Sequence, residues 1–550
     1  MTVAAARSLV DEMTRTPTGR SSVSVYETGR LVSLSPWLTL HVERIRHLLD
    51  AERPDGGWGG PDDGYALVPT LSATEGLLAA LRRGDLDAVA EPLAKGAVAA
   101  VDRGLVFLRD RLATLDASRL PDMPAVDLIV PALVEALAAH LAALRETPVA
   151  GLEAWRDVPA PPLPPGLRRT RLERVRAALA SGHPLPEKLL HALEVTGPAA
   201  HRAAGVAPVG PGTVGASPAA TAAWLGTPDP GTDVARRYLE AVVRQYGGPV
   251  PCTSPISVFE RSWVVSTLIR AGLPVPVPAT VLAGLRDTLG PTGTATAPGL
   301  PADADTTSVT LYALATSGQP VDPSSLWSFD TGEHFCTWPG EDGASITTNA
   351  HVLDALGWHL RHPGPATGDG GTVPSADRAR LAAAVHRLSA WLADRQEAEG
   401  SWCSDRWHAS PYYATWCAVL ALHDYGVGPA VGPAVQRAVR WVLAGQHADG
   451  SWGRWGGTAE ETAYALQVLC VAGATSTPAT AQAVDRGRRW LSTVESVEDG
   501  PALWHDKDLY RPSLIVRAAV LAATWLGRPV GSADPGDPEP PLRSAMIRIA

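Results

Sequence analysis

Gln396-Glu-Ala-Glu-Gly-Ser-Trp402 is followed, 50 residues later, by Gln446-His-Ala-Asp-Gly-Ser-Trp452. A shorter relative, Asp55-Gly-Gly-Trp58, lacks the glutamine. Each segment precedes an apolar helical pattern, at residues 414–423, 462–472 and 71–81. A repeat of this length that joins a turn to helices predicts a helical solenoid or a closed α/α barrel. We expect each tryptophan to pack at a turn, where glycine permits its approach and glutamine bonds a helix end.

The composition agrees with a helical, globular protein. The chain has 550 residues, of which 45% are apolar and 19% charged, with a formal net charge of −10. Helical patterns rich in Ala, Leu and Arg dominate, and alternating strand patterns are scarce, so we expect an all-α protein. The negative charge argues against nucleic-acid binding as the main activity.

The cysteines and the apolar runs indicate where in the cell the protein resides. The five cysteines are odd in number and contain no Cys-x-x-Cys pair, which argues against a disulfide framework or a structural zinc site. The first 18 residues lack the apolar core of a secretory signal. The longest apolar run, residues 128–144, is interrupted by Pro131, Glu135 and His140, so it reads as a buried helix. We therefore expect a cytoplasmic protein without an integral membrane segment.

The sequence Asp303-Ala-Asp305-Thr306-Thr307 follows a loop and opens a helical pattern. Two buried carboxyl groups this close cannot ionise independently, so one is held protonated and can deliver its proton. The same residues also suit an ordinary helix cap, because Asp is favoured at N-cap positions. Taken alone, the motif leaves both interpretations open.

The repeats and the acidic motif together resemble the class II terpene cyclases. The family motif is Asp-x-Asp-Asp, and Thr306 replaces its last residue in a variant that is similar to bacterial drimenyl diphosphate synthases. Further matching segments occur in family order between about Asp55 and Leu526, at residues 259–263, 336–341, 348–353, 406–415 and 504–512.

The resemblance implies two α/α barrels, a β domain and a γ domain inserted near its start, with the substrate between them. The implied boundaries are residues 1–35 for the first β segment, 36–252 for γ, 253–530 for the rest of β and 531–550 for a tail.

The resemblance also implies the catalytic roles. Asp305 would be the general acid that protonates a terminal alkene, and Asp303 would polarise it or hold its geometry. Asn349 would hydrogen-bond the acid. Thr306 would supply a hydroxyl where relatives have a third carboxylate, so the acid's environment would carry less negative charge.

A carbocation needs a dry cavity with aromatic faces that stabilise it without trapping it. The matching segments offer Trp338, Trp407, Tyr412, Tyr413 and Tyr510. The base that ends the reaction stays open among His351, His408 and a bound water.

A diphosphate at the far end requires cations, with or without Mg²⁺. The candidates are Arg171, Arg174, Lys188, Lys507 and Arg511. Most of the acidic string that holds Mg²⁺ in plant relatives is missing here, which leaves Asp116 and Asp127 as outer ligands. We expect Mg²⁺ to bind together with the diphosphate.

We expect the enzyme to convert farnesyl diphosphate to drimenyl diphosphate. The chain lacks the Asp-Asp-x-x-Asp cluster of class I cyclases, so the product should keep its diphosphate. The first alternative is a diterpene cyclase that converts geranylgeranyl diphosphate to a copalyl-type product. A triterpene cyclase fits less well, because its membrane-entry surface and extra repeats are not evident.

Two alternatives come from other classes. An α/α-barrel glycoside hydrolase would need two acids roughly 5–10 Å apart across an open cleft. A protein-prenyltransferase-like barrel would need an Asp/Cys/His zinc site, for which only His351 and Cys336 are near in sequence. The expected partners are an isoprenoid diphosphate and a downstream phosphatase or second terpenoid enzyme, and homo-oligomerisation stays open.

Overall fold

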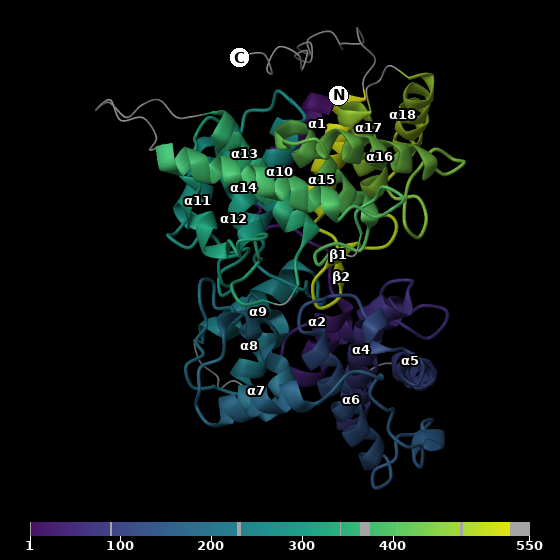
Figure 1. Ribbon diagram of the computed structural model, residues 1–550. Coiled ribbons are helices and arrows are strands. Elements are labelled where there is room, and N and C mark those ends of the chain that lie inside the picture. The colour runs from purple at the N-terminus through teal and green to yellow at the C-terminus, as the bar shows by residue number, and fades with distance from the viewer. Residues whose placement is uncertain are drawn as a thin grey trace.

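The computed structural model describes residues 2–87, 91–227, 233–341, 343–362, 375–403, 405–473 and 477–527. They form two helical barrels, one above the other in Figure 1. The expected tail at residues 531–550 lies outside the described residues.

The upper barrel is a double ring of helices around one hydrophobic core. Its inner helices contact one another in cyclic order and are apolar on nearly all sides, as buried helices must be. They are α10 (Ser257–Arg270), α12 (Ala304–Thr316), α13 (Ile346–Arg361), α15 (Pro411–Tyr425), α17 (Ala459–Ala472) and α19 (Ser513–Leu526). Outside them lie α1 (Thr2–Arg15), α11 (Ala279–Thr288), η4 (Pro323–Phe329), α14 (Ser375–Asp394), α16 (Val431–Ala444) and α18 (Pro478–Leu491).

The lower barrel repeats this plan with a smaller ring. Its inner elements, again in cyclic contact, are α2 (Val25–Leu34), α4 (Asp63–Arg83), α6 (Val126–Ala143), η3 (Glu187–Ala200) and α8 (Pro218–Leu225). The remaining elements are α3 (His41–Asp50), α5 (Glu91–Leu112), η1 (Ala117–Arg119), η2 (Glu153–Trp155), α7 (Thr170–Ala180) and α9 (Val234–Gln245). The expectation of an all-α fold with two α/α barrels is therefore confirmed.

The chain passes between the barrels twice, and the two crossings run side by side. Ser24 and Val250 form a backbone bridge, and the Ile256 N–H donates to the Thr18 carbonyl at 2.7 Å. The packing places α2 in the lower barrel, since Tyr26 lies in its core. The first crossing thus precedes α2, whereas the expected boundary after residue 35 assigned this helix to the β domain.

Each tryptophan of the repeats bonds the C-terminal end of the helix that precedes it. The indole N–H groups of Trp402 and Trp452 donate to the Leu392 and Val442 carbonyls at 2.8 and 2.7 Å. Trp58 in the lower barrel makes the same bond to Leu48 at 2.6 Å. The motif therefore marks an equivalent turn in both barrels.

The two glutamines of the repeats join a turn to the next helix. The Gln396 amide donates to the Gly400 and Ala434 carbonyls at 2.7 and 2.9 Å. Gln446 makes the corresponding bonds to Gly450 and Ala483, both at 2.9 Å. Each glutamine thereby links the carbonyl of its own turn to a carbonyl of the following outer helix.

Helix α6 is the one helix among the described residues that is long and apolar enough, by length and composition, to cross a membrane. Half of its apolar window is buried inside the structure, and core helices of that kind pass the same test. Its place in the inner ring accounts for its composition.

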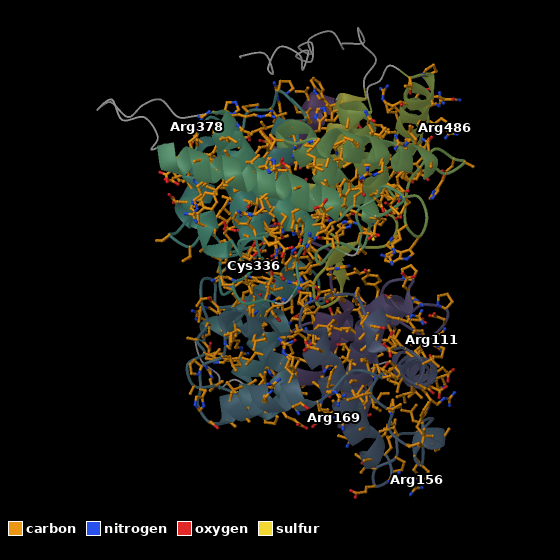
Figure 2. All side chains as sticks on the ribbon, in the orientation of Figure 1. Arg111, Arg156, Arg169, Cys336, Arg378 and Arg486 are labelled. Atoms are coloured by element: carbon orange, nitrogen blue, oxygen red, sulfur yellow. The ribbon has the colours of Figure 1, made fainter. Side chains whose placement is uncertain are left out.

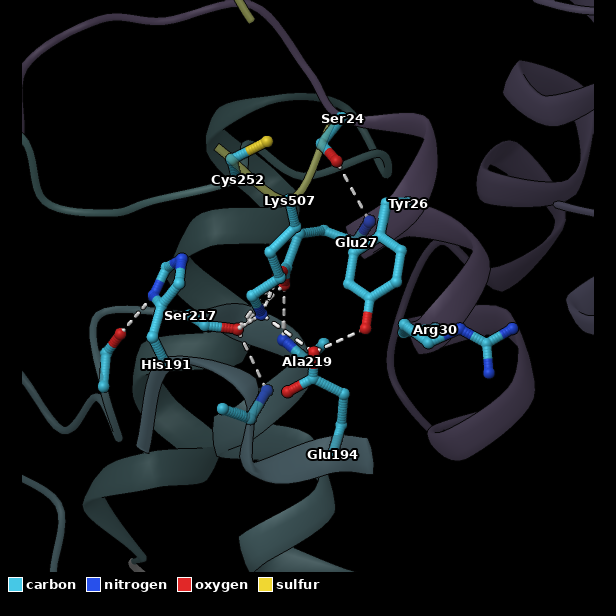
Figure 3. A network of polar contacts seen from close by, with 12 residues as sticks. Ser24, Tyr26, Glu27, Arg30, His191, Glu194, Ser217, Ala219, Cys252 and Lys507 are labelled. Carbon is cyan, nitrogen blue, oxygen red and sulfur yellow. Dashed lines mark hydrogen bonds and ion pairs between the residues drawn. The ribbon is translucent and has the colours of Figure 1, made fainter. Parts of the chain in front are cut away.

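A short hairpin of the upper barrel, β1 (Trp504–His505) and β2 (Leu509–Tyr510), inserts its turn into the lower barrel. Figure 3 shows Lys507 of this turn donating to Glu27, Glu194 and Ser217, at 2.5, 2.9 and 2.8 Å. All four side chains are buried. This network ties the two barrels together.

Figure 2 places Cys336 where the barrels meet. Its labelled arginines lie at the periphery instead: Arg111, Arg156, Arg169, Arg378 and Arg486.

Candidate active site

A cavity of about 470 Å³ lies between the two barrels. This volume is within the roughly 300–1,000 Å³ of small-molecule sites. The lower barrel lines it with residues 122–128 and 188–189, Arg171, His191 and Ala192. The upper barrel lines it with aromatic side chains and with Asp303, Asp305 and Thr306.

Asp303 is the N-cap of α12. One carboxylate oxygen accepts the Thr306 N–H at 2.6 Å, and the other accepts the Thr296 hydroxyl at 3.2 Å. Burial and the neighbouring Asp305 charge raise the pKa of Asp303 to about 7. The capping interpretation of the motif thus holds for its first carboxyl.

Asp305 lies in the first turn of α12 and lines the cavity. Its Oδ1 is 2.7 Å from Nδ1 of His351 on α13. The carboxyl is buried, with 9% of the residue exposed. Its other oxygen has no protein partner among the described residues, which leaves it free to act on a ligand.

The partners of His351 assign its tautomer. Nε2 lies 3.5 Å from Sγ of Cys417, and burial raises the Cys417 pKa well above the ordinary thiol value. A protonated thiol donates, so Nε2 accepts. Nδ1 then carries the ring proton and donates to Asp305.

Asn349 does not contact the acid. Its side-chain oxygen accepts the Phe335 N–H at 2.8 Å, and its NH₂ donates to the Phe335 and Ser345 carbonyls at 3.0 and 2.8 Å. The prediction that Asn349 bonds Asp305 is therefore wrong in this structure. His351, two residues further along α13, occupies that position instead.

Thr306 contributes through its hydroxyl. It lines the cavity and is 2.8 Å from the Thr296 hydroxyl, which in turn donates to Asp303. Its backbone N–H bonds the same carboxylate. Thr306 thus supports the cap and adds no charge beside Asp305.

Three of the five predicted aromatic residues line the cavity: Trp338, Trp407 and Tyr510. Trp338 and Trp407 pack edge to face at 5.4 Å. Tyr412 instead packs against Trp441 with the rings tilted by 38°, and Tyr413 accepts a hydrogen bond from the Trp263 indole at 2.9 Å. Neither tyrosine belongs to the cavity lining.

Three aromatic side chains of the cavity lining were not predicted: Phe259, Trp263 and Trp504. All three lie in segments 259–263 and 504–512, which already carried the family resemblance. The segments were therefore informative, but the direction of each side chain was not readable from them.

Two of the predicted cations line the cavity, Arg171 and Lys188. Arg171 pairs with Asp127 at 2.5 Å. Arg406, which was not predicted, also lines the cavity and pairs with Asp122 at 2.7 Å and with Glu341.

The other three predicted cations lie elsewhere. Arg174 is exposed on α7 and is not part of the cavity lining. Lys507 is enclosed by the acids of the network between the barrels. Arg511 is buried and donates to the Gly500 carbonyl at 2.6 Å. These three assignments to the diphosphate are not supported by the geometry.

The two predicted Mg²⁺ ligands differ in position. Asp116 is exposed, and its carboxylate caps η1 by accepting the Ser118 N–H at 2.9 Å. Asp127 lines the cavity, as does Asp122. Within the described ranges no three His, Cys, Asp or Glu side chains form a metal site. One or two carboxylates do suit Mg²⁺ that is held mainly by substrate phosphates.

The histidines near the cavity have distinct partners. His408 is buried outside the lining, 3.1 Å from Glu460 and stacked on Tyr413. His191 and His505 line the cavity and were not predicted. Burial lowers the pKa of His505 to about 4, so this ring is neutral at pH 7.

The geometry does not favour the hydrolase or zinc alternatives. Asp303 and Asp305 lie on one helix end, and both Asp303 oxygens are hydrogen-bonded, so no second acid from this motif faces Asp305 across a cleft. The Cys336 thiol donates to the Phe329 carbonyl at 3.3 Å. One cavity-facing carboxyl bonded to a histidine and surrounded by aromatic rings suits proton delivery to an apolar molecule.

Comparisons with known proteins are consistent with proton delivery to an apolar molecule. The squalene-hopene cyclase C-terminal domain matches residues 373–512. An ent-copalyl diphosphate synthase of Streptomyces sp. (strain KO-3988) is 43% identical over 94% of this chain and 94% of that protein. A copalyl diphosphate synthase of Streptomyces cyslabdanicus is 42% identical over 95% of both chains. The solved ent-copalyl diphosphate synthase of Streptomyces platensis superimposes with a TM-score of 0.86 at 43% identity, covering 96% of this chain and 99% of that one.

Proposed function

The chain belongs to the class II terpene cyclase family, and on that premise we propose that it converts geranylgeranyl diphosphate to a copalyl-type diphosphate. The observation that carries this proposal is the buried Asp305–His351 pair at the cavity between the barrels. The C20 substrate is supported by relatives about 42–43% identical that are named as copalyl diphosphate synthases. This proposal replaces the expectation of farnesyl diphosphate, which rested on the Thr306 variant alone.

The reaction begins with proton transfer from the free oxygen of Asp305 to the terminal alkene. The alkene π electrons form the new C–H bond, and a tertiary cation develops on the neighbouring carbon. Asp305 is left as a carboxylate, which accepts the hydrogen bond from the His351 Nδ1–H. Asp303 supports the geometry as the helix cap and is a positioning residue.

The cation then passes along aromatic faces. Trp338, Trp407 and Tyr510, together with Trp263 and Trp504, line the cavity. Ring faces attract cations, by about 2 kcal/mol or more where water is excluded. Cyclisation ends when a proton leaves the bicyclic cation, and the C–O bond to the diphosphate is never broken.

The diphosphate end is assigned to the cations of the cavity lining. Arg171, Lys188 and Arg406 all line the cavity and offer guanidinium and ammonium donors. Asp122 and Asp127, beside them, would hold Mg²⁺ through its outer waters or directly, and the ion would neutralise diphosphate charge. A phosphatase or a second terpenoid enzyme would consume the product, and a cytoplasmic location stays a prediction.

The test incubates purified protein with geranylgeranyl and farnesyl diphosphate in parallel, with and without Mg²⁺. Products are dephosphorylated and identified by mass spectrometry, with Asp305→Asn as the control. We expect a bicyclic C20 alcohol from the wild type, and at least ~100-fold less from Asp305→Asn. A bicyclic C15 product alone would overturn the substrate assignment. Full activity of Asp305→Asn would overturn the assignment of Asp305 as the general acid.

A further inference from the structure

The three Lys and Arg side chains that line the cavity, among the described residues, belong to different barrels. Arg171 is on α7 and Lys188 is on η3, both in the lower barrel. Arg406 precedes α15 in the upper barrel, the barrel that also carries Asp305. The separation between Arg406 and the acid is therefore fixed within one barrel, whereas that of the other two cations depends on how the barrels meet.

Glu341 holds the guanidinium of Arg406. One carboxylate oxygen of Glu341 pairs with Nη1 of Arg406, and the Glu341 side chain is 4% exposed. The other oxygen accepts the Thr337 N–H. Asp122 of the lower barrel also pairs with Arg406, at 2.7 Å, but its side chain is 65% exposed. Since exposed ion pairs are weak and screened by salt, the buried partner decides where the guanidinium lies.

Residues 335–341 form a turn that is fixed to two inner helices of the upper barrel, and we call it the linking turn. The Thr337 carbonyl accepts the Ala304 N–H at 3.0 Å, and Ala304 begins α12. The backbone of Phe335 exchanges two hydrogen bonds with the Asn349 side chain of α13, at 2.8 and 3.0 Å. A shift of the linking turn would break these buried bonds or move the start of α12.

A short path of contacts through the linking turn joins Arg406 to the acid. The path runs through three residues: Glu341, Thr337 and Ala304. Ala304 directly precedes Asp305 in the chain. Thr337 and Ala304 take part through backbone atoms, whereas Glu341 takes part through its side chain. The length and charge of that side chain therefore decide how far Arg406 lies from the acid.

In the proposed reaction, the substrate must place its terminal alkene at Asp305 while its diphosphate is bound by cations. The separation between acid and cation therefore limits which chain length is protonated, and a misplacement of about 1 Å can cost about 100-fold in rate. We propose that Glu341 is a positioning residue that holds Arg406 at the separation suited to a C20 chain, and thereby selects geranylgeranyl over farnesyl diphosphate. This inference rests on the proposed function.

Binding of the diphosphate leaves this arrangement in place. A diphosphate would displace Asp122, the more exposed of the two carboxylates on Arg406, and accept the guanidinium donor that Asp122 releases. Glu341 would keep its bonds to Arg406 and Thr337. A farnesyl chain is one isoprene unit shorter and cannot meet both ends, so its reaction gains less from Glu341.

Two variants of Glu341 test the proposal. Glu341→Gln keeps the length of the side chain and removes the charge that holds Arg406. Glu341→Asp keeps the charge and shortens the side chain by one methylene group. Glu333→Gln is the matched control, because Glu333 lies just before the linking turn and pairs with Arg395 at the surface, with 69% of its side chain exposed.

For each protein, kcat and KM are measured with geranylgeranyl and farnesyl diphosphate, along with thermal unfolding. We expect both Glu341 variants to lower kcat/KM for the C20 substrate about 10–100-fold and to leave the C15 value nearly unchanged. The ratio of the two values, C20 over C15, should fall about 10-fold or more. Where C15 turnover is too slow to measure, the inhibition constant of farnesyl diphosphate takes its place. The control should change neither value.

Arg406→Gln shows whether Glu341 acts through the guanidinium. We expect Arg406→Gln to lower the C20 value as well, and Glu341→Gln added to it should cause no further fall. Fully additive losses would mean that Glu341 acts by another route, and would overturn the proposal. Equal losses for C20 and C15, the result of a merely structural role, or no loss at all would also overturn it. A wild-type protein that prefers the C15 substrate would overturn the proposed substrate itself, and the wild type alone shows that outcome.

Discussion

Asp303 and Asp305 are the same residue type two positions apart, yet they do different work. Both carboxylate oxygens of Asp303 accept hydrogen bonds at the start of α12, from the Thr306 N–H and the Thr296 hydroxyl. Asp305 keeps one oxygen for the cavity and receives His351 on the other. The division follows from helix geometry, since an N-cap side chain turns back to the helix end and a first-turn side chain points outward.

His351 and Asn349 also have different roles, although they are two residues apart. His351→Leu removes the donor to Asp305, so we expect kcat to fall about 10–100-fold with a small change in melting temperature, because a leucine fills the site. Asn349→Leu removes three buried hydrogen bonds to Phe335 and Ser345, so we expect it to lower the free energy of unfolding by about 2–4 kcal/mol.

Melting curves and kcat measured on the two purified variants decide between these roles. The reverse pattern, a stable Asn349→Leu protein that has lost kcat and an unaffected His351→Leu protein, would restore Asn349 as the partner of the acid. Asp305→Asn serves as the inactive reference.

At the scale of elements, the tryptophan turns set how closely neighbouring helices approach. Trp452 is fully buried, and Gly487 of α18 lies against its ring. A Cβ added at Gly487 would be 2.6 Å from a Trp452 ring carbon, closer than carbon atoms can pack. The glycine is therefore required by the ring and not by a turn.

We expect Gly487→Ala to lower the free energy of unfolding by about 1–3 kcal/mol, because the rigid ring must move. Gly432→Ala is the matched control, since Gly432 is in α16 of the same barrel and an added Cβ meets nothing within 4 Å. The control should be neutral, or more stable by about 0.5–1 kcal/mol. Denaturant unfolding of both variants measures this, and equal effects would show that contact with Trp452 does not limit packing.

At the scale of the whole molecule, buried polar groups fix the position of one barrel on the other. Lys507 pairs with Glu27 and Glu194 of the lower barrel, and all three side chains are at most 1% exposed. A cation so enclosed is not available to a diphosphate. Removing it would leave two buried carboxylates without their positive counter-charge, which typically costs about 3–5 kcal/mol.

The crossing between the barrels contains a further buried acid, Glu260 on α10. One of its oxygens accepts the Arg20 N–H at 2.8 Å, and the other has no partner. Burial raises its pKa to about 7 from an ordinary value of 4.5. Since the folded state holds this proton more tightly than the unfolded state, the group's contribution to stability falls as pH rises from about 4.5 to 7, and is constant above.

Glu260→Gln removes that titration without changing the shape of the side chain. We expect the variant and the wild type to have similar unfolding free energies at pH 4.5, and the variant to gain by on the order of 2–3 kcal/mol relative to wild type at pH 8. Denaturant unfolding of both proteins at the two pH values measures the gain. A difference that does not change with pH would mean that the pKa of Glu260 is the same in the folded and unfolded states.

The sequence by itself determined the helices, the repeated turns and the acidic motif. These depend on contacts within a few residues or on a periodic pattern: a cap bonds three residues ahead, and an apolar face recurs every three or four. The role of Asp305 came from the family resemblance, because the motif by itself also suited a helix cap.

Only the tertiary structure decided which distant side chains meet the acid and line the cavity. His351 and Asn349 are two residues apart on α13 and therefore point in different directions around the helix, so a small difference in packing selects one of them. Tyr412 and Tyr413 are not part of the cavity lining, and Lys507 pairs with acids 313 and 480 residues away in the chain. Such choices depend on how two barrels meet, and no local pattern in the sequence records that contact.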